Sequence, residues 1–121
     1  MASTAAIVAT ARTPIATAYR GSLVDVDAFI LARLTVAEVV RRSGLAPEQI
    51  DDVILGESLY GGGAIARHAA VAAGLPGVPG IAHNRHCASG LGAIQSAAAS
   101  IMAGMDRAVV AGGVQSKSTV P

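Results

Sequence analysis

Cys87, the single cysteine of the chain, is the residue whose type and position could do the most chemistry. It lies where a short extended run gives way to a helix of small residues, and the first turn of a helix leaves backbone N–H groups unpaired. Thiols at helix starts ionise more readily than free ones, and the same N–H groups can hold a negative oxygen that forms on a carbonyl under attack. The position indicates a nucleophile, although a lone cysteine is also commonly a small buried hydrophobe.

None of the three histidines is placed by the sequence pattern to act as a base for this thiol. His86 is adjacent to Cys87, and neighbours in an extended segment project to opposite sides. His83 would share a face with Cys87, but four strand steps separate them by about 13 Å. His68 belongs to another predicted helix. The pattern therefore predicts a nucleophile whose base lies elsewhere.

Other patterns carry weaker chemical signals. The glycine triplet at residues 61–63 lacks both the Lys-Ser/Thr pair of a phosphate loop and the spacing of a dinucleotide site, so we interpret it as a loop before a helix. The histidine and cysteine spacings match no common zinc pattern, and we expect no metal site. Asp51 and Asp52 are neighbours that enter a strand, so they point to opposite faces and indicate a solvated turn.

The composition limits the fold and the partners. Hydrophobic residues make up 52% of the 121 residues and charged residues only 14%, so we expect a partner subunit or further chain to cover much of the surface. A net charge of +1 without a basic stripe argues against nucleic acid. Residues 86–105 lack charged side chains but include serines and glycines, which favours a buried helix over a membrane span. One cysteine and no expected signal peptide favour a reducing, cytoplasmic location.

Strand-like and helix-like segments alternate along the chain. Short apolar runs predict strands at residues 5–11, 53–55, 81–86 and 108–111. Helical patterns cover residues 25–43, 64–73 and 90–103, with glycine caps at Gly44 and Gly104. The last strand is too apolar to be an edge, and the last helix is suited to burial on nearly all sides. This order predicts an α/β fold with a mainly parallel sheet that is incomplete in this chain.

Several motifs in a fixed order accompany the cysteine. They are Ala11-Arg12-Thr13-Pro14-Ile15, Asp52-Val53-Ile54-x-Gly56, Ala66-Arg67-x-Ala69-Ala70, Gly74-Leu75-Pro76, Asn84-Arg85-x-Cys87-x-Ser89-Gly90-Leu91 and Ala111-Gly112-Gly113-x-x-Ser116-x-Ser118. Together they resemble the thiolases, the family of acetyl-CoA acetyltransferases and 3-ketoacyl-CoA thiolases. The resemblance implies a layered α/β/α fold of two similar halves, of which residues 1–121 form part of the N-terminal domain.

The resemblance also implies roles for the residues around the cysteine. Cys87 would be the catalytic nucleophile that accepts an acyl group from a CoA thioester, with its own N–H directed at the acyl oxygen. The family's later histidine and second cysteine have no counterpart in these residues. Ser89 is interpreted as a helix cap, and Asn84 and Arg85 as holding the cysteine loop or a dimer contact.

The resemblance further implies acyl-CoA as substrate, no permanently bound cofactor, a homodimer or homotetramer, and no membrane partner. The chain departs from the family's pattern at four places. Ala16-Thr17 replace a Gly-Lys type pair, and Ala64-Ile65 follow the glycines where the family commonly has Gln-Asn. His86 is unusual directly before the nucleophile, and Gln115 stands where an acidic residue is common. These departures leave the substrate preference open. Two other hypotheses also stay open, namely a non-catalytic thiolase-like fragment that serves as a dimerisation or assembly module, and a redox sensor built on a reactive thiol.

Overall fold

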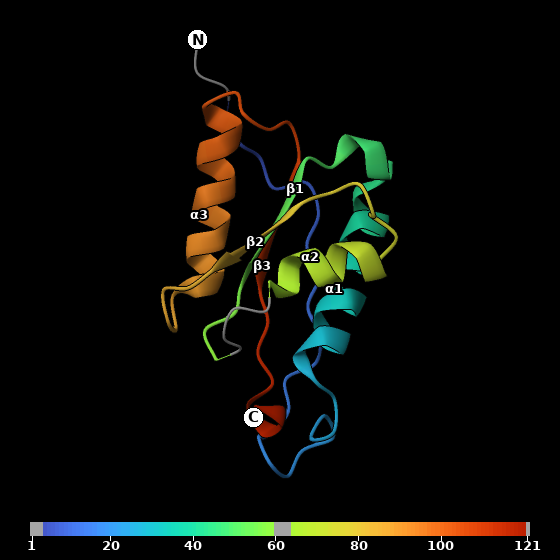
Figure 1. Cartoon of the computed structure of the whole chain (residues 1–121), viewed down its shortest axis with the longest axis vertical. Coiled ribbons are helices and arrows are strands. Elements are labelled where there is room, and N and C mark those ends of the chain that lie inside the picture. The colour runs from blue at the N-terminus through green and yellow to red at the C-terminus, as the bar shows by residue number, and fades with distance from the viewer. Residues whose placement is uncertain (1–3, 60–63, 121) are drawn as a thin grey trace.

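The computed structural model describes residues 4–59 and 64–120, and the predicted glycine loop at 61–63 lies outside them. Within those residues, helices and strands alternate along the chain (Figure 1). In chain order they are α1 (Ala28–Ser43), the 3-10 turn η1 (Pro47–Gln49), β1 (Asp52–Gly56), α2 (Ile65–Ala72), β2 (Gly80–His83), α3 (Ser89–Met102), β3 (Val109–Gly113) and the 3-10 turn η2 (Lys117–Thr119).

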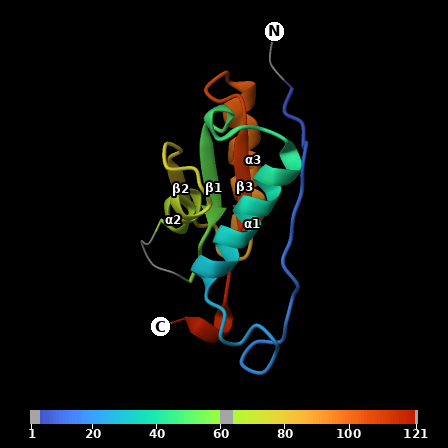
Figure 2. The same ribbon diagram turned by 90° about the vertical axis from the view of Figure 1, so that its right-hand side faces the viewer.

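The described strands form one parallel sheet in the order β2-β1-β3. Its register places Val53 opposite Gly80, and Gly56 opposite Gly113. Helices α1 and α2 cover one face and α3 covers the other, which gives three layers (Figures 1 and 2). The connections through α2 and α3 therefore cross on opposite faces of the sheet. This arrangement confirms the predicted α/β fold with parallel strands.

Side-chain alternation along β1 places apolar residues on both faces of the sheet. Val53 and Leu55 pack with α1 and α2 around the buried Ile65, while Ile54 packs on the other face against Ala97 of α3. Each fully buried side chain of this size contributes roughly 1.5–3 kcal/mol to folding. Strand β1 is thus the element on which both helical layers assemble.

Helix α1 begins and ends at residues that can satisfy its free backbone groups. The Asp27 Oδ1 accepts a 2.9 Å hydrogen bond from Ile30 N, so the helix starts at Ala28, later than the predicted residue 25. Gly44 adopts a φ of 71° after the last turn, which confirms the predicted glycine cap. The cap residues therefore set both ends of this helix.

The N-terminal segment does not form the strand that its apolar residues predict. Residues 5–11 belong to no described β-ladder, and Ile7 and Val8 are 77% and 73% exposed. The segment runs beside the molecule on the β3 side of the sheet (Figure 2). An apolar, β-branched run forms a strand only where another strand supplies hydrogen-bond partners, and the described strands do not supply them to residues 5–11. The strand prediction is therefore wrong for this chain.

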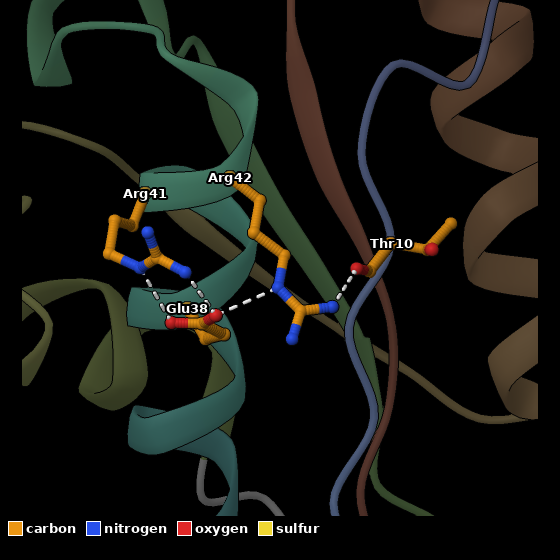
Figure 3. A network of polar contacts seen from close by, with 4 residues as sticks. All are labelled: Thr10, Glu38, Arg41 and Arg42. Atoms are coloured by element: carbon orange, nitrogen blue, oxygen red, sulfur yellow. Dashed lines mark hydrogen bonds and ion pairs between the residues drawn. The ribbon is translucent and has the colours of Figure 1, made fainter.

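A polar network on α1 holds the N-terminal segment at one point (Figure 3). Arg42 Nη1 donates to the Thr10 carbonyl oxygen at 2.8 Å, and its Nε donates to Glu38 Oε1 at 2.7 Å. Arg41 makes a two-pronged contact with both oxygens of the same carboxylate. Hydrogen bonds first from Arg41 and then from Arg42 lower the pKa of Glu38 to about 2. Glu38 therefore stays ionised and fixes the guanidinium that holds Thr10.

Helix α3 turns its small residues toward the sheet and its larger apolar residues outward. Gly92, Ala93 and Ala97 are buried, whereas Leu91 is 74% exposed and Met102 is 51% exposed. Small side chains allow the helix to lie close to β1 and β3, so packing selects that face. The expectation that α3 is buried on nearly all sides is wrong for the described chain. The expectation that the last strand is not an edge is also wrong, because β3 borders the described sheet.

Residues 4–59 and 64–120 include neither a membrane-spanning helix nor a metal-ligating cluster. None of the described helices has the length and apolar character needed to cross a membrane. The same residues contain no group of three or more metal-ligating side chains placed to hold an ion.

Candidate active site

Cys87 lies in a tight turn between β2 and α3. Strand β2 ends at His83 and α3 begins at Ser89, so the predicted extended run to residue 86 is too long. His86 has a φ of 51°, in the left-handed region that side chains other than glycine seldom adopt. The thiol of Cys87 is free and exposed. The nucleophile predicted from the sequence is therefore presented on a turn with a left-handed residue directly before it.

Hydrogen bonds from neighbouring side chains hold this turn. Asn84 Oδ1 accepts from His86 N at 2.9 Å. The hydroxyl of Ser89 accepts from Arg85 N at 2.7 Å and donates to the His86 carbonyl oxygen, also at 2.7 Å. Left-handed backbone costs about 1–3 kcal/mol and persists where surrounding contacts fix it. Asn84 and Ser89 supply those contacts, in agreement with the loop-holding role expected of Asn84.

The hydroxyl of Ser89 does not cap the helix as the sequence predicted. The N-cap position is Ala88, which makes no side-chain capping bond, and Ser89 is the first helical residue. Its side chain is buried, with 5% exposure, and points back into the turn. The cap interpretation is therefore wrong: the hydroxyl satisfies groups of the turn that leads into the helix.

The backbone N–H groups after the cysteine are partly occupied. Ala88 N donates to the Arg85 carbonyl oxygen at 3.0 Å, and Ser89 N donates to the His86 carbonyl oxygen at 3.1 Å. The N–H of Cys87 forms no hydrogen bond with another described residue. The N–H of Cys87 is thus open to a new acceptor.

Glycines at the carboxyl ends of β1 and β3 allow α3 to begin close to the sheet. A Cβ added at Gly56 would lie 2.5 Å from the Ser89 Cβ and 2.9 Å from the Ser89 carbonyl carbon. A Cβ at Gly113 would lie 3.1 Å from the Gly90 Cα. Both glycines therefore position the cysteine turn through close backbone approach. Glycine directly after an apolar strand is a sequence signal of such close packing.

An open hollow of about 390 Å³ adjoins the cysteine at the carboxyl ends of β1 and β3. Its lining includes Cys87, the polar residues Ser58, His86 and Gln115, and the apolar residues Leu59 and Val114. In open α/β sheets the crevice outside the carboxyl ends of parallel strands is the usual ligand position. The exposed thiol and the usual binding position of the fold thus coincide. Ser58 and the placement of Gln115 were missed from the sequence, because they depend on how β1 and β3 pair.

The histidines do not supply a hydrogen-bonded base to the thiol. His83 packs against α3, and a Cβ at Gly92 would lie 2.5 Å from its Nε2, which is buried without a partner among the described residues. His68 of α2 meets the ring of Phe29 edge-on at 4.8 Å. His86 does line the same hollow as Cys87, because residue 86 is in a turn and not in the extended segment assumed from the sequence. Among the described residues, no side chain is hydrogen-bonded to the thiol.

The paired aspartates form a structural contact at the other end of the sheet. Asp51 Oδ1 accepts from Arg107 Nη2 at 2.8 Å, and hydrogen bonds from Arg107 hold the pKa of Asp51 well below its usual range. Burial raises the pKa of Asp52, and the nearby Asp106 adds to this shift. The turn is therefore not simply solvated as expected, and the two carboxylates do not converge on one site.

Comparison with known families matches residues 5–121 to the family described as thiolase, N-terminal domain. The chain belongs to the thiolase family. The acetyl-CoA acetyltransferase of Cupriavidus necator is 42% identical to this thiolase chain over 118 residues, which cover 95% of the chain and 30% of that relative. The 3-ketoacyl-CoA thiolase of Bacillus subtilis is 42% identical over 121 residues, which cover 97% of the chain and 31% of that relative.

A solved thiolase-family structure has the same fold. The Bacillus anthracis acetyl-CoA acetyltransferase matches with a TM-score of 0.80 and 42% identity, over 84% of this chain and 26% of that one. The match confirms the expected thiolase-like α/β fold. The chain spans only 30–31% of the length of the two curated relatives above.

Proposed function

We propose that this thiolase-family chain carries the acyl-accepting nucleophile of a CoA-dependent acyltransferase, and that Cys87 is that nucleophile. The observation that carries the proposal is the exposed thiol of the only cysteine, on a turn fixed by Asn84 and Ser89, beside a hollow at the carboxyl ends of the sheet. The names of the relatives, acetyl-CoA acetyltransferase and 3-ketoacyl-CoA thiolase, support the reaction class.

The proposed step is transfer of an acyl group between two sulfur atoms. The Cys87 thiolate attacks the thioester carbonyl of an acyl-CoA, and a new carbon–sulfur bond forms while the negative oxygen accepts a hydrogen bond from the Cys87 N–H. The carbon–sulfur bond to CoA then breaks, and the CoA thiolate leaves with a proton equivalent to the one that Cys87 lost. The product is an acyl-cysteine. Its acyl group can then pass to a second CoA or to an acetyl carbanion equivalent, which releases the Cys87 thiolate.

The rest of the catalytic apparatus belongs, in this proposal, to residues outside the 121. Residues 1–121 are then part of an N-terminal thiolase domain, consistent with coverage of 30–31% of the two curated relatives. A base for Cys87 and a CoA-binding element would come from further chain, in a cytoplasmic homo-oligomer without a permanent cofactor. The exposed Ile7, Val8 and Leu91 provide apolar surface that such further chain or subunits could cover.

Acyl-enzyme formation tests the role of Cys87. The 121-residue chain and a full-length protein that contains it are incubated with acetyl-CoA, and intact mass is measured. We expect a mass increase of one acetyl group in the full-length protein, mapped to Cys87, and none in the Cys87→Ala variant. Acetylation that persists in Cys87→Ala would contradict the assignment of Cys87 as the nucleophile.

A second function, assembly without catalysis, is favoured by the absence of a hydrogen-bonded base among the described residues. In that case the chain associates with thiolase subunits but does not turn over. Cleavage of acetoacetyl-CoA in the presence of CoA separates the two. Turnover by the isolated chain excludes the assembly-only function, whereas turnover only by the longer protein identifies the chain as one portion of the enzyme.

A further inference from the structure

Two residues that depart from the thiolase pattern meet in one place. His86 and Gln115 lie 29 positions apart in the sequence, yet both line the hollow beside Cys87, and both are exposed. Neither the imidazole nor the carboxamide forms a hydrogen bond with another described residue. Each can donate an N–H, so the hollow holds two donors that are available to a ligand beside the thiol.

The backbone that carries His86 is fixed. Its N–H donates to Asn84 Oδ1 at 2.9 Å, and its carbonyl oxygen accepts from both the hydroxyl and the N–H of Ser89, at 2.7 and 3.1 Å. A side chain on such a backbone samples only its own rotamers. A ligand that binds the imidazole therefore has only these rotamers to order, which lowers the entropic cost of binding.

The charge around the hollow is not negative. Its described lining contains no carboxylate. Glu57 lies in the sequence between Gly56 and Ser58, which line the hollow. It is 5% exposed, and its carboxylate accepts from Ile65 N at 2.7 Å, so the carboxylate is directed to α2. Arg85 lies next to His86, with its Nη1 donating to Gln95, and Lys117 follows Gln115 by two positions. An anionic group entering the hollow therefore meets donors and meets no described acid.

We propose that His86 and Gln115 make the Cys87 hollow selective for short acyl groups that end in a carboxylate. The imidazole and carboxamide N–H groups donate to that carboxylate while Cys87 holds the acyl carbon. This inference rests on the proposed acyl transfer to Cys87, and it names the class of substrate. An alkyl acyl group of equal length offers no acceptor to either donor, so it lacks this contribution to binding.

Alkylation of the single cysteine tests the selectivity without any acyl transfer. Iodoacetate and iodoacetamide differ by one negative charge, and either one forms a carbon–sulfur bond at Cys87 with loss of iodide. The ratio of their rate constants is measured on the 121-residue chain and on N-acetylcysteine. We expect the iodoacetate-to-iodoacetamide ratio to be about threefold higher for Cys87 than for the free thiol, the size of an exposed charge effect.

Matched variants locate the effect. His86→Gly removes the imidazole and suits the φ of 51°. Gln115→Glu adds a carboxylate to the hollow. Both variants should lower the iodoacetate-to-iodoacetamide ratio to that of the free thiol or below it. His86→Asn keeps an amide donor at a left-handed position and should retain part of the preference. Gln49→Glu makes the same charge change on η1, away from the hollow, and should leave the ratio unchanged. A wild-type ratio equal to that of the free thiol, or an elevated ratio unchanged in both His86→Gly and Gln115→Glu, overturns the proposal.

Acyl-CoA donors of equal chain length test the same selectivity in the proposed acylation of Cys87. Acylation of the full-length protein by succinyl-CoA and by butyryl-CoA is compared by intact mass, and we expect succinyl transfer to be favoured in wild type and disfavoured in Gln115→Glu. If neither donor nor acetyl-CoA acylates Cys87, the proposed function fails, while the alkylation ratio still decides the selectivity. If acylation occurs with no preference for succinyl, the selectivity fails and the proposed function stands.

Discussion

The two ends of the parallel sheet are held together by different kinds of contact. At the carboxyl end, Gly56 and Gly113 let the start of α3 approach strand backbone, and the buried hydroxyl of Ser89 ties the cysteine turn. At the amino end, Asp51 and Arg107 form an ion pair in which the arginine side chain is 74% exposed. The first end depends on excluded volume and buried hydrogen bonds, and the second depends on charges in contact with water.

This difference indicates where the chain tolerates substitution. Backbone atoms in close contact cannot rotate away from an added methyl group, whereas an exposed ion pair is screened by solvent and salt. The end that carries the proposed nucleophile is therefore the more demanding one. Substitutions at the carboxyl end should therefore destabilise the fold more than substitutions at the amino end.

Gly56→Ala should have the largest effect, because its Cβ would lie 2.5 Å from the Ser89 Cβ and 2.9 Å from the Ser89 carbonyl carbon. We expect the free energy of unfolding to fall by about 3 kcal/mol, at the upper part of the overpacking range. Urea unfolding followed by circular dichroism measures it. Gly77→Ala is the control, since a Cβ at that position meets no heavy atom within 4 Å. Equal midpoints for the two variants would contradict the close-packing account.

Ser89→Ala should be the next largest, because it removes the bond from Arg85 N and the bond to the His86 carbonyl oxygen at a buried site. We expect a loss of about 1–3 kcal/mol in the free energy of unfolding. The same variant should slow alkylation of Cys87 by iodoacetamide, since the turn loses its hold on the left-handed residue. Ser100→Ala, which also loses a hydroxyl-to-carbonyl bond in α3, should leave the alkylation rate unchanged.

His83 and Gly92 should show energetic coupling. Alanine at 92 gains about 1 kcal/mol of helix propensity over glycine, but its Cβ would lie 2.5 Å from His83 Nε2. We expect Gly92→Ala to be neutral or destabilising in the wild-type background and stabilising by about 1 kcal/mol in a His83→Ala background. A double-mutant cycle by urea unfolding measures the difference. Additive effects would show that the imidazole does not determine glycine at this position.

The ion pair at the amino end should have the smallest effect, and one that depends on pH. Because Arg107 lowers the folded-state pKa of Asp51, the pair stabilises the fold above the unfolded pKa of about 3.9, and this stabilisation is lost as pH falls through the folded pKa. Asp51→Asn should therefore lower Tm at pH 7 by less than Ser89→Ala does. The difference from wild type should shrink in acid and in 1 M salt. A Tm difference that grows below pH 4 would contradict the assignment.

The sequence was most informative where local chemistry decides the structure. Gly44 marks the end of α1, and the apolar run before Gly56 marks β1, because a glycine cap and strand burial act over a few residues. The turn at Cys87 was expected at the correct place, but its shape was not. The left-handed φ of His86 follows from bonds to Asn84 and Ser89, and no pattern of residue types reports such a bond.

Features that depend on packing between distant segments could not be predicted in the same way. Helix α3 has a stripe of larger apolar residues, yet the sheet contacts its small residues, since only these allow close approach to Gly56 and Gly113. Residues 5–11 have the composition of a strand, but strand formation requires a partner that the described strands do not provide. The meeting of His86 and Gln115 likewise depends on the order β2-β1-β3.

The loop before α1 has consequences for how the chain folds during synthesis. Tyr19 N donates to Ser118 Oγ at 2.8 Å, and Ser116 Oγ donates to the Val26 carbonyl oxygen at 2.8 Å, over sequence separations of 99 and 90 residues. A ribosome makes residues 19 and 26 several seconds before residues 116–118, at about 5–20 residues per second. The early loop must therefore wait, without these partners, while the intervening βαβ units form. Its amide hydrogens should be the last to gain protection from exchange as the nascent chain lengthens.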